Sequence, residues 1–424
     1  METGVPPAML IDGARDPLRG LRPVVTETHR LVRASTPIAA KRNDALALDR
    51  ESSAPAPTYQ QQARLRRACW AFATRRVPPA AACSILRAAS VPQAGDLVLA
   101  RVDVLGHHCN LQLANGRRRC LFEGDEIVVA YANRYASSQF EALVPKTLGP
   151  CHLVAGGGIA ARAVSWHEQI ARGPTHITPI GLLADCAGRR INLRDYALRP
   201  VHTIPDPALA TVAVVGTAMD AGKTQTAAFL VRGLRAAGLR AAYAKVTGTG
   251  AGGDTWLLKD AGAYPVLDFT DAGMASTYLA SPEEVAGVLL TLIGHIARED
   301  VDAVVLEIAD GVYQRETAAL LRSTTFARLV GGIVLAARDS MGAAAGVNWL
   351  RNQSTPVLAL SGVLSASPLQ SREASAATNL PVYSRADIAD PSTAMAIAGR
   401  VQRFMMDHQS EQQTDHARER LTAV

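Results

Sequence analysis

Three consecutive residues, Gly222, Lys223 and Thr224, have the types and the order that a site for nucleotide phosphates requires. The apolar run 211–216 before them predicts a buried strand, and a helical pattern begins at the lysine. Backbone N–H groups at a helix N-terminus donate to phosphate oxygens, a glycine allows close approach, and a lysine reaches the terminal phosphates. The threonine hydroxyl is placed to bind Mg²⁺. The sequence therefore predicts a P-loop for ATP or GTP with Mg²⁺.

The loop departs from the standard spacing, because its first glycine, Gly216, lies one residue earlier than the motif places it. The alternative interpretation is an ordinary turn between a strand and a helix, with Lys223 exposed. We expect the nucleotide to be contacted by Gly216, Thr217, Asp220, Ala221, Gly222, Lys223, Thr224 and Gln225.

Two further apolar runs lead into charged residues. Lys245 ends one run and precedes the glycine-rich segment 246–253, whereas Glu307 and Asp310 lie at the end of the other. Because ligands bind at the carboxyl edge of open α/β sheets, we expect all three side chains beside the phosphates. Lys245 would bind an anionic substrate or stabilise charge during transfer. Glu307 would hold Mg²⁺ together with Thr224, and Asp310 would hold the metal or orient a nucleophile.

These assignments have structural alternatives. Lys245 could be a surface lysine on a mobile loop, and Asp310 could cap the helix predicted after it. Arg315 could clamp a phosphate, and turn chemistry explains the aspartates of neighbouring loops as well as catalysis does. The weaker candidates are Asp254, Asp268, Asp271, Arg315, Asp339, Ser340 and Gly342.

Apolar strand-like runs alternate with helical patterns after Thr211, which predicts a doubly wound α/β domain with a parallel sheet over residues 205–408. Residues 59–200 differ, because from Gly95 the hydrophobic period is two, as in a small antiparallel sheet or barrel that ends near Leu198. Asn115-Gly116 predicts a hairpin whose two central residues both have positive φ.

The remaining segments carry weaker signals. Residues 61–90 predict one or two helices, the second of them starting at the prolines 78–79. We expect residues 1–58 to be a disordered tail and 409–424 to be a flexible one. The segment 149–162 is a candidate anion-binding loop, His107, His108 and His152 lack a metal partner at useful spacing, and the polar–aromatic segment 132–145 suggests no mechanism.

Charge and cysteines limit the classes of protein. Residues 1–200 hold 26 Lys and Arg against 16 Asp and Glu, whereas residues 201–424 hold 18 against 22. The basic excess forms no continuous stripe, so an anionic small molecule is expected as partner and nucleic acid is not. None of the six cysteines forms a C-x-x-C pair, and reduced thiols are expected. Without a long apolar run or an apolar signal core, we expect a cytoplasmic protein, as a homodimer.

The long loop resembles that of dethiobiotin synthetase and its relatives, including cobyrinic acid a,c-diamide synthase, which carry G-T-x-x-x-x-G-K-T. In those enzymes a strand ending in lysine and a later strand ending in an acidic Mg²⁺ ligand follow, as Lys245 and Glu307 do here. The resemblance covers roughly residues 211–400. The segments K-V-T-G-T-G, L-D-F-T-D-A-G and D-G-V-Y-Q-R-E-T are more similar to an uncharacterised branch beside the D-glutamate N-acetyltransferase (DUF1611-type) family, whose loop reads G-K-M where this chain has Thr224.

Three functions are compatible with these features. The first is an ATP-dependent ligase, synthetase or kinase that phosphorylates a carboxylate or a carbamate of a small metabolite, with Lys223, Lys245, Glu307 and Asp310 as catalytic residues. The second is a nucleotide-gated binding or regulatory module. The third, implied by the neighbouring family, is acyl transfer from acetyl-CoA to an amino acid.

Overall fold

The computed structural model describes residues 59–87, 91–205 and 209–422, and their side chains from residue 60 to residue 407. The chain divides into two compact units, Met1–Ser52 and Ser53–Val424, and every described residue belongs to the second. The tail expected at 1–58 lies outside the described residues. We name residues 59–200 the β region and residues 209–422 the P-loop region.

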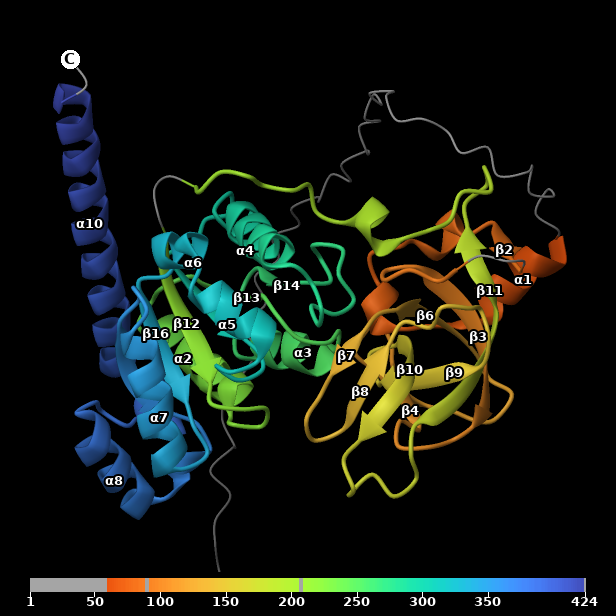
Figure 1. The fold of residues 1–424 in the computed structure, drawn as a ribbon, viewed down its shortest axis with the longest axis horizontal. Coiled ribbons are helices and arrows are strands. Elements are labelled where there is room, and N and C mark those ends of the chain that lie inside the picture. Colours follow the sequence, from red (N-terminus) through yellow and green to blue (C-terminus); the bar gives the residue numbers. More distant parts are fainter. Residues whose placement is uncertain (1–58, 88–90, 206–208, 423–424) are drawn as a thin grey trace, which may run out of the picture. The chain divides into compact units, whose positions relative to one another are not determined.

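The P-loop region contains a six-stranded sheet in which all neighbouring strands are parallel, as predicted (Figure 1). The spatial order is β14-β13-β15-β12-β16-β17. In this register Lys245 lies between Glu307 and Asp268, so three charged side chains follow one another across adjacent strand ends. The strands are β12 (Ala210–Gly216), β13 (Ala241–Lys245), β14 (Val266–Asp268), β15 (Ala303–Ile308), β16 (Gly332–Ala336) and β17 (Val357–Ser361).

Helices cover both faces of this sheet. One face packs against α4 (Pro282–Ile296), α5 (Arg315–Leu321), α6 (Thr324–Leu329), α7 (Ser340–Arg351) and α8 (Pro368–Thr378). The short helix η4 (Val363–Ala366), just before α8 in the chain, packs on the same face. The opposite face packs against α2 (Lys223–Ala236), α3 (Gly252–Asp260), α9 (Arg385–Ala389) and α10 (Pro391–Thr422). The helix α10 continues to Thr422 through the segment expected as a flexible tail, which contains neither glycine nor proline.

The β region contains a nine-stranded sheet that closes on itself. Strand β6 pairs with β3 on one side and with β10 on the other, so β6, β3, β11, β9 and β10 form a five-stranded barrel. Among the strand pairs described in this sheet, β1–β6 and β10–β6 are parallel and the others are antiparallel. The barrel strands are β3 (Leu97–Val104), β6 (Glu126–Tyr131), β9 (Cys151–Ala155), β10 (Ile159–Trp166) and β11 (Thr175–Ala184).

Short elements complete the β region: α1 (Tyr59–Arg67), β1 (Cys69–Trp70), η1 (Phe72–Thr74), η2 (Pro79–Ala81), β2 (Ser84–Leu86), β4 (Asn110–Gln112), β5 (Arg118–Cys120), β7 (Arg134–Tyr135), β8 (Phe140–Leu143) and η3 (Leu193–Tyr196). The predicted hairpin exists, since β4 and β5 are antiparallel, but of its two signal residues only Gly116 has a positive φ, +86°. The turn is centred one residue earlier than predicted, because the Gly116 N–H donates to Leu113 O.

The prediction of a second helix starting at the prolines 78–79 was wrong. Those residues lead into the single turn η2, and β2 then pairs antiparallel with β11. The same pairing brings Cys83 to Cys186, and the two form a disulfide with Cα atoms 5.0 Å apart, in contrast to the expected reduced thiols. Their separation of 103 residues hides this contact from the sequence.

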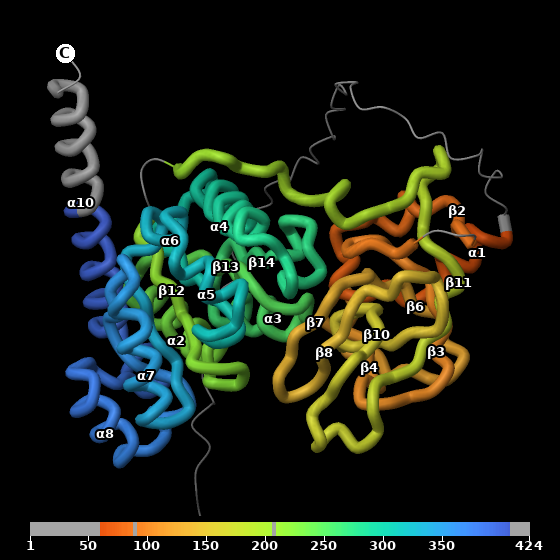
Figure 2. The backbone as a smooth tube through the Cα atoms, in the orientation of Figure 1, coloured from red at the N-terminus to blue at the C-terminus, as the bar shows by residue number. Residues whose placement is uncertain are grey.

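The segment that joins the two regions, between η3 and β12 in the sequence, packs along the helix α4. Figure 2 shows its described part as the yellow-green tube that runs past α4. The Val201 N–H donates to Thr291 Oγ1 (3.3 Å), and Val201 packs against Gly294 of the same helix. The Leu198 N–H donates to Asp271 O (2.8 Å). The linking segment is therefore attached to the P-loop region before β12 begins.

Candidate functional site

The P-loop connects β12 to α2. Gly222 precedes the first residue of α2 and has φ of +97°, a conformation that favours glycine. A Cβ atom at this position would lie 3.0 Å from Gly362 Cα, so the close approach of η4 also requires glycine. Asp220 has φ of +60° and is exposed, and Gln225 is exposed on the first turn of α2. The backbone thus forms the predicted strand–turn–helix.

Lys223 is buried and not exposed on a turn, in contrast to the alternative interpretation. Its side chain is 6% exposed, and Nζ donates to Ala218 O (2.9 Å) and Asp310 O (2.6 Å). Burial lowers the pKa of Lys223 below its usual value, although Glu307 and Asp310 act in the opposite direction. The ammonium group is therefore held over the loop by two neutral carbonyl groups, and no carboxylate of the described residues forms an ion pair with it.

Glu307 lies near the carboxyl end of β15, between the strands β13 and β12, and is 1% exposed. Its Oε1 accepts a hydrogen bond from Thr224 Oγ1 (3.2 Å) and lies 3.1 Å from Lys245 Nζ. Its Oε2 accepts from the Tyr243 hydroxyl (2.9 Å). Both residues predicted to bind Mg²⁺, Thr224 and Glu307, are therefore in direct contact.

Lys245 forms two ion pairs, with Glu307 and with Asp254 of α3. Burial alone would lower the pKa of Lys245, but the two carboxylates outweigh it and raise that pKa above its usual value. We name Lys245, Glu307, Asp254, Tyr243 and Thr224 the Lys245 cluster. It brings together three predicted site residues and one weaker candidate, Asp254.

Asp310 lies next to this cluster and does not cap a helix. The N-cap of α5 is Gln314, whose side chain accepts from the Thr317 N–H (2.9 Å). Burial raises the pKa of Asp310 above its usual value, against the opposing effects of Lys223 and Lys245. The Val312 N–H donates to Gly216 O (3.1 Å), which ties the segment after β15 to the P-loop.

A cavity of about 460 Å³ opens at these strand ends, and both regions line it. This volume lies in the range of small-molecule sites. From the P-loop region it is lined by Met219, Lys245, Gly248, Thr249, Ala251, Asp254, Ala309 and Asp310. From the β region it is lined by His107, His108, Cys109, Asn110, Gln112, Arg118, Arg134, Tyr135, Ala136, Gln139, Ala155, Gly156 and Gly157.

Sequence reasoning missed the wall contributed by the β region. Arg134, Tyr135 and Gln139 belong to the polar–aromatic segment to which no mechanism was assigned, and Ser138 of that segment contacts the P-loop itself. The Ser138 hydroxyl donates to Asp220 Oδ2 (3.2 Å). The one feature of the sequence that could have indicated this wall is the cluster of polar residues in the segment 132–145, within a region of strand-like alternation.

The candidate anion-binding loop also lies at this wall. A Cβ atom on Gly157 would lie 1.9 Å from Gly250 O, so only glycine permits the glycine turn of the β region to approach the segment after Lys245. Residues Gly156 and Gly157 line the cavity through this approach. The glycines therefore bring two backbone segments together, and nothing in the geometry assigns them an anion.

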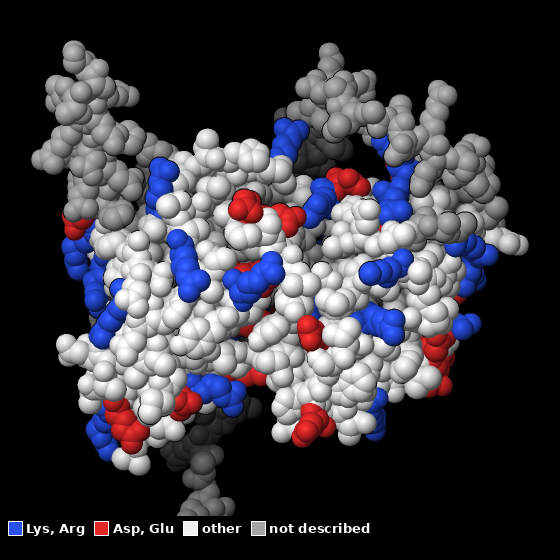
Figure 3. All heavy atoms as spheres, viewed as in Figure 1, with Lys and Arg blue, Asp and Glu red and all other residues white. Residues whose placement is uncertain are grey.

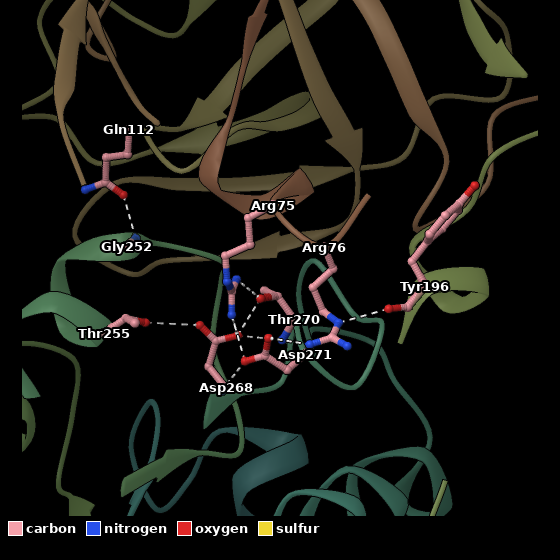
Figure 4. A network of polar contacts seen from close by, with 9 residues as sticks. All are labelled: Arg75, Arg76, Gln112, Tyr196, Gly252, Thr255, Asp268, Thr270 and Asp271. Atoms are coloured by element: carbon pink, nitrogen blue, oxygen red, sulfur yellow. Dashed lines mark hydrogen bonds and ion pairs between the residues drawn. The ribbon is translucent and has the colours of Figure 1, made fainter. Parts of the chain in front are cut away.

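Asp268 and Asp271 do not reach the cavity lining. Arg75 of the β region lies between them, with Nη2 3.1 Å from Asp268 Oδ1 and 2.7 Å from Asp271 Oδ2, and it also contacts the Thr270 hydroxyl (Figure 4). Arg76 Nη1 lies 3.3 Å from Asp271 Oδ1. We name these five residues the Arg75 cluster. It joins the β region to the loop after β14.

The other weak candidates lie away from the cavity lining. The Arg315 side chain is 68% exposed and pairs with Glu316. Asp339 caps α7 by accepting from the Gly342 N–H (2.7 Å), and Ser340 donates to Glu373 (3.0 Å). Among the described residues, no group of three or more His, Cys, Asp and Glu is placed to hold a metal ion. No helix in the described part of the chain is long and apolar enough to cross a membrane.

No protein-family model matches the chain, and no curated protein matches it. Several solved structures are similar in fold to about half of this chain. The signal recognition particle 54 kDa protein of Aeropyrum pernix in complex with GDP is 17% identical over 49% of this chain and 51% of that chain, with a TM-score of 0.32. A DUF1611 family protein from Anabaena variabilis is 15% identical over 49% and 63%, with a TM-score of 0.32.

The signal recognition particle receptor FtsY of Elizabethkingia anophelis is 16% identical over 50% of this chain and 65% of that chain, with a TM-score of 0.27. The chain thus spans between half and two thirds of the length of these structures. At such TM-scores these likenesses carry no argument about function. The P-loop assignment rests on the geometry of residues 216–224.

Proposed function

We propose that this protein binds a nucleoside triphosphate at the P-loop and transfers its terminal phosphoryl group to a carboxylate of a small metabolite in the cavity. The observation that supports this most directly is that Lys245, Asp310 and the P-loop residue Met219 line one cavity of about 460 Å³. Phosphoryl transfer depends mainly on positioning and on charge stabilisation, and Lys223 and Lys245 are suited to both.

The proposed reaction begins when a carboxylate oxygen of the metabolite attacks the γ-phosphorus of the nucleotide. The bond between that phosphorus and the bridging oxygen to the β-phosphate breaks, and the nucleoside diphosphate leaves with the electron pair. The product is an acyl phosphate. A nucleophile then attacks its acyl carbon and releases inorganic phosphate, which is the overall course of a ligase or synthetase.

Each residue has a role that its position supports. Lys223 would bind the β- and γ-phosphates once it leaves the two carbonyl groups that hold it. Lys245 would neutralise the charge that develops on the transferred group. Asp310 lines the cavity, and burial raises its pKa above its usual value, so it would accept a proton from the nucleophile.

Thr224 and Glu307 fit a Mg²⁺ ion. Their oxygens lie 3.2 Å apart at the carboxyl edge of the sheet, and Mg²⁺ is commonly held by one or two protein oxygens together with phosphates and water. When bound, the ion would neutralise charge on the phosphate oxygens. Lys245 Nζ lies 3.1 Å from Glu307 Oε1, the oxygen that also contacts Thr224. This ion pair would hold the carboxylate in place for the ion.

An anionic small molecule is the partner in this proposal. On the face shown in Figure 3, Lys and Arg side chains are scattered singly among Asp and Glu. Phosphate backbones are bound by clustered basic side chains, and our proposal is therefore an anionic small molecule rather than nucleic acid, in keeping with this face. A cytoplasmic homodimer remains our expectation.

Thermal unfolding with ATP, GTP or acetyl-CoA, each with Mg²⁺, tests the proposal. A ligand at 100 times its Kd stabilises the folded state by about 2.7 kcal/mol. ATP or GTP should raise Tm in the wild type and have no effect in Lys223→Ala, whereas Lys259→Ala, on the exposed surface of α3, should respond as the wild type does. A rise with acetyl-CoA alone, or an unchanged nucleotide response in Lys223→Ala, would rule out the proposed reaction.

A further inference from the structure

Arg134 is a buried cation in the cavity wall, 5% exposed, on β7. Its Nη1 lies 3.0 Å from His108 Nε2, and its Nη2 donates to Gln139 Oε1 (2.5 Å). Its Nε is buried and has no hydrogen-bond partner among the described residues. The guanidinium group is thus oriented by two neutral side chains, and its Nε–H has no partner among the described residues.

No carboxylate of the described chain lies within ion-pair distance of this guanidinium group. Arg75, an arginine whose side chain is 15% exposed, lies within 3.1 Å of two carboxylates. Burying a cation without an anion is costly, and such a group in a cavity wall is a candidate for a ligand-binding residue. Burial also lowers the pKa of Arg134 to about 10, which still leaves the group charged at neutral pH.

The nearby Asp310 does not serve as this anion. It affects Arg134 electrostatically from across the cavity, but the two groups form no ion pair, and burial raises the pKa of Asp310. The two walls also differ in charge: the β-region wall carries Arg118 and Arg134 and no carboxylate, whereas Asp254 and Asp310 both belong to the P-loop region.

We infer that Arg134 binds a carboxylate group of the ligand in this cavity, which makes the β region the part of the protein that recognises the substrate. The unused Nε and the neighbouring Nη groups offer the in-plane donors that a carboxylate oxygen pair accepts. Gln112 belongs to the same wall, and its Oε1 accepts from the Gly252 N–H (2.7 Å), so its orientation is fixed by the P-loop region. The inference rests on the proposed function, because the carboxylate belongs to the metabolite that accepts the phosphoryl group.

Stability of the full chain provides the first test. Arg134→Gln removes an uncompensated charge, so the ligand-free variant should unfold at a Tm equal to or above that of the wild type. Arg75→Gln removes a compensated charge and should lower Tm. If Arg134→Gln lowers Tm as Arg75→Gln does, Arg134 is a structural cation and the inference is wrong.

Binding provides the second test, by calorimetric titration with acetate, succinate, glutarate and citrate, their neutral amides, and inorganic phosphate. At least one carboxylate should bind the wild type, its amide should not, and Arg134→Gln should weaken binding at least about tenfold. Arg134→Lys should retain part of the affinity. The matched control is Arg101→Gln, an exposed arginine of β3 outside the cavity lining, which should bind as the wild type does.

The inference is contradicted if no carboxylate binds the wild type, if Arg134→Gln binds it equally well, or if only inorganic phosphate binds. ATP titration of the same variants separates this failure from that of the proposed function. Intact ATP binding in both proteins, with no dependence of carboxylate binding on Arg134, overturns the inference alone. Absence of nucleotide binding in the wild type overturns the proposed function.

Discussion

Two ion clusters, each built on a buried carboxylate, lie at neighbouring strand ends of the same sheet, and they differ in what surrounds them. In the Arg75 cluster two arginines face two aspartates, so the formal charges balance, and none of these side chains lines the cavity. In the Lys245 cluster one lysine faces two carboxylates, and Lys245 and Asp254 line the cavity. The balanced cluster is suited to holding the two regions together, whereas the unbalanced one is suited to binding a further cation or a ligand.

The comparison also shows that the role of a charged residue at a strand end depends on its interaction partners. Asp268 and Lys245 are paired in register on adjacent strands, so their positions in the fold are equivalent. Asp268 is engaged by an arginine from the β region, whereas Lys245 is engaged by carboxylates from its own region. The partner, and not the position, separates the structural group from the candidate catalytic one.

The largest expected effect is on activity in the Lys245 cluster. Lys245→Ala should reduce nucleotide turnover about 100- to 1,000-fold, because it removes a preorganised positive charge from the reacting groups. Release of nucleoside diphosphate measures this. Lys259→Ala, on the exposed side of α3, should retain wild-type turnover. Equal turnover in both variants would place Lys245 in a structural role like that of Arg75.

The next effect is on stability in the Arg75 cluster. Arg75→Ala leaves Asp268 and Asp271 buried without their main cation, so the free energy of unfolding should fall by about 3–5 kcal/mol. Chemical denaturation measures the change, and Arg66→Ala, an exposed arginine of α1, is the control. The nucleotide Kd should stay unchanged at temperatures where the variant is folded. A variant with normal stability but impaired nucleotide binding would reverse the roles of the two clusters.

The smallest effect concerns pH dependence at Asp310. Because burial raises its pKa, the folded state binds a proton more tightly than the unfolded state, so stability falls as pH rises from about 3.8 through the folded pKa. Asp310→Asn should therefore be more stable than the wild type at pH 7, and the difference should vanish below about pH 3.8. Denaturation of both proteins across this range measures it, with Asp260→Asn, exposed at the end of α3, as control. A gain that is largest at low pH would contradict the assignment.

The sequence predicted those parts of the fold and site that depend on local patterns. Continuous apolar runs indicated the parallel sheet, and because strand ends of such a sheet share one edge, Lys223, Lys245, Glu307 and Asp310 were expected together. The hairpin near Asn115-Gly116 was confirmed, since turn chemistry is local, although its turn is centred one residue earlier than predicted.

The parts that depend on distant contacts could not be predicted. Arg134 reaches the cavity from another sheet, and Arg75 meets Asp268 across 193 residues, so no spacing reports either contact. The helix expected to start at the prolines 78–79 does not form beyond the turn η2, because β2 pairs with β11. This pairing outweighs the local helical preference of the alanines at 80–82.

Trapping of an acyl phosphate tests the central claim most directly. The wild type would be incubated with Mg²⁺, ATP or GTP, hydroxylamine and the carboxylate that binds it most tightly, and hydroxamate and nucleoside diphosphate would be measured together. We predict equal amounts of the two products, none with Lys223→Ala, and a strong reduction with Arg134→Gln. Nucleoside diphosphate formed without any hydroxamate, at a rate that the carboxylate does not change, would contradict phosphoryl transfer in this cavity.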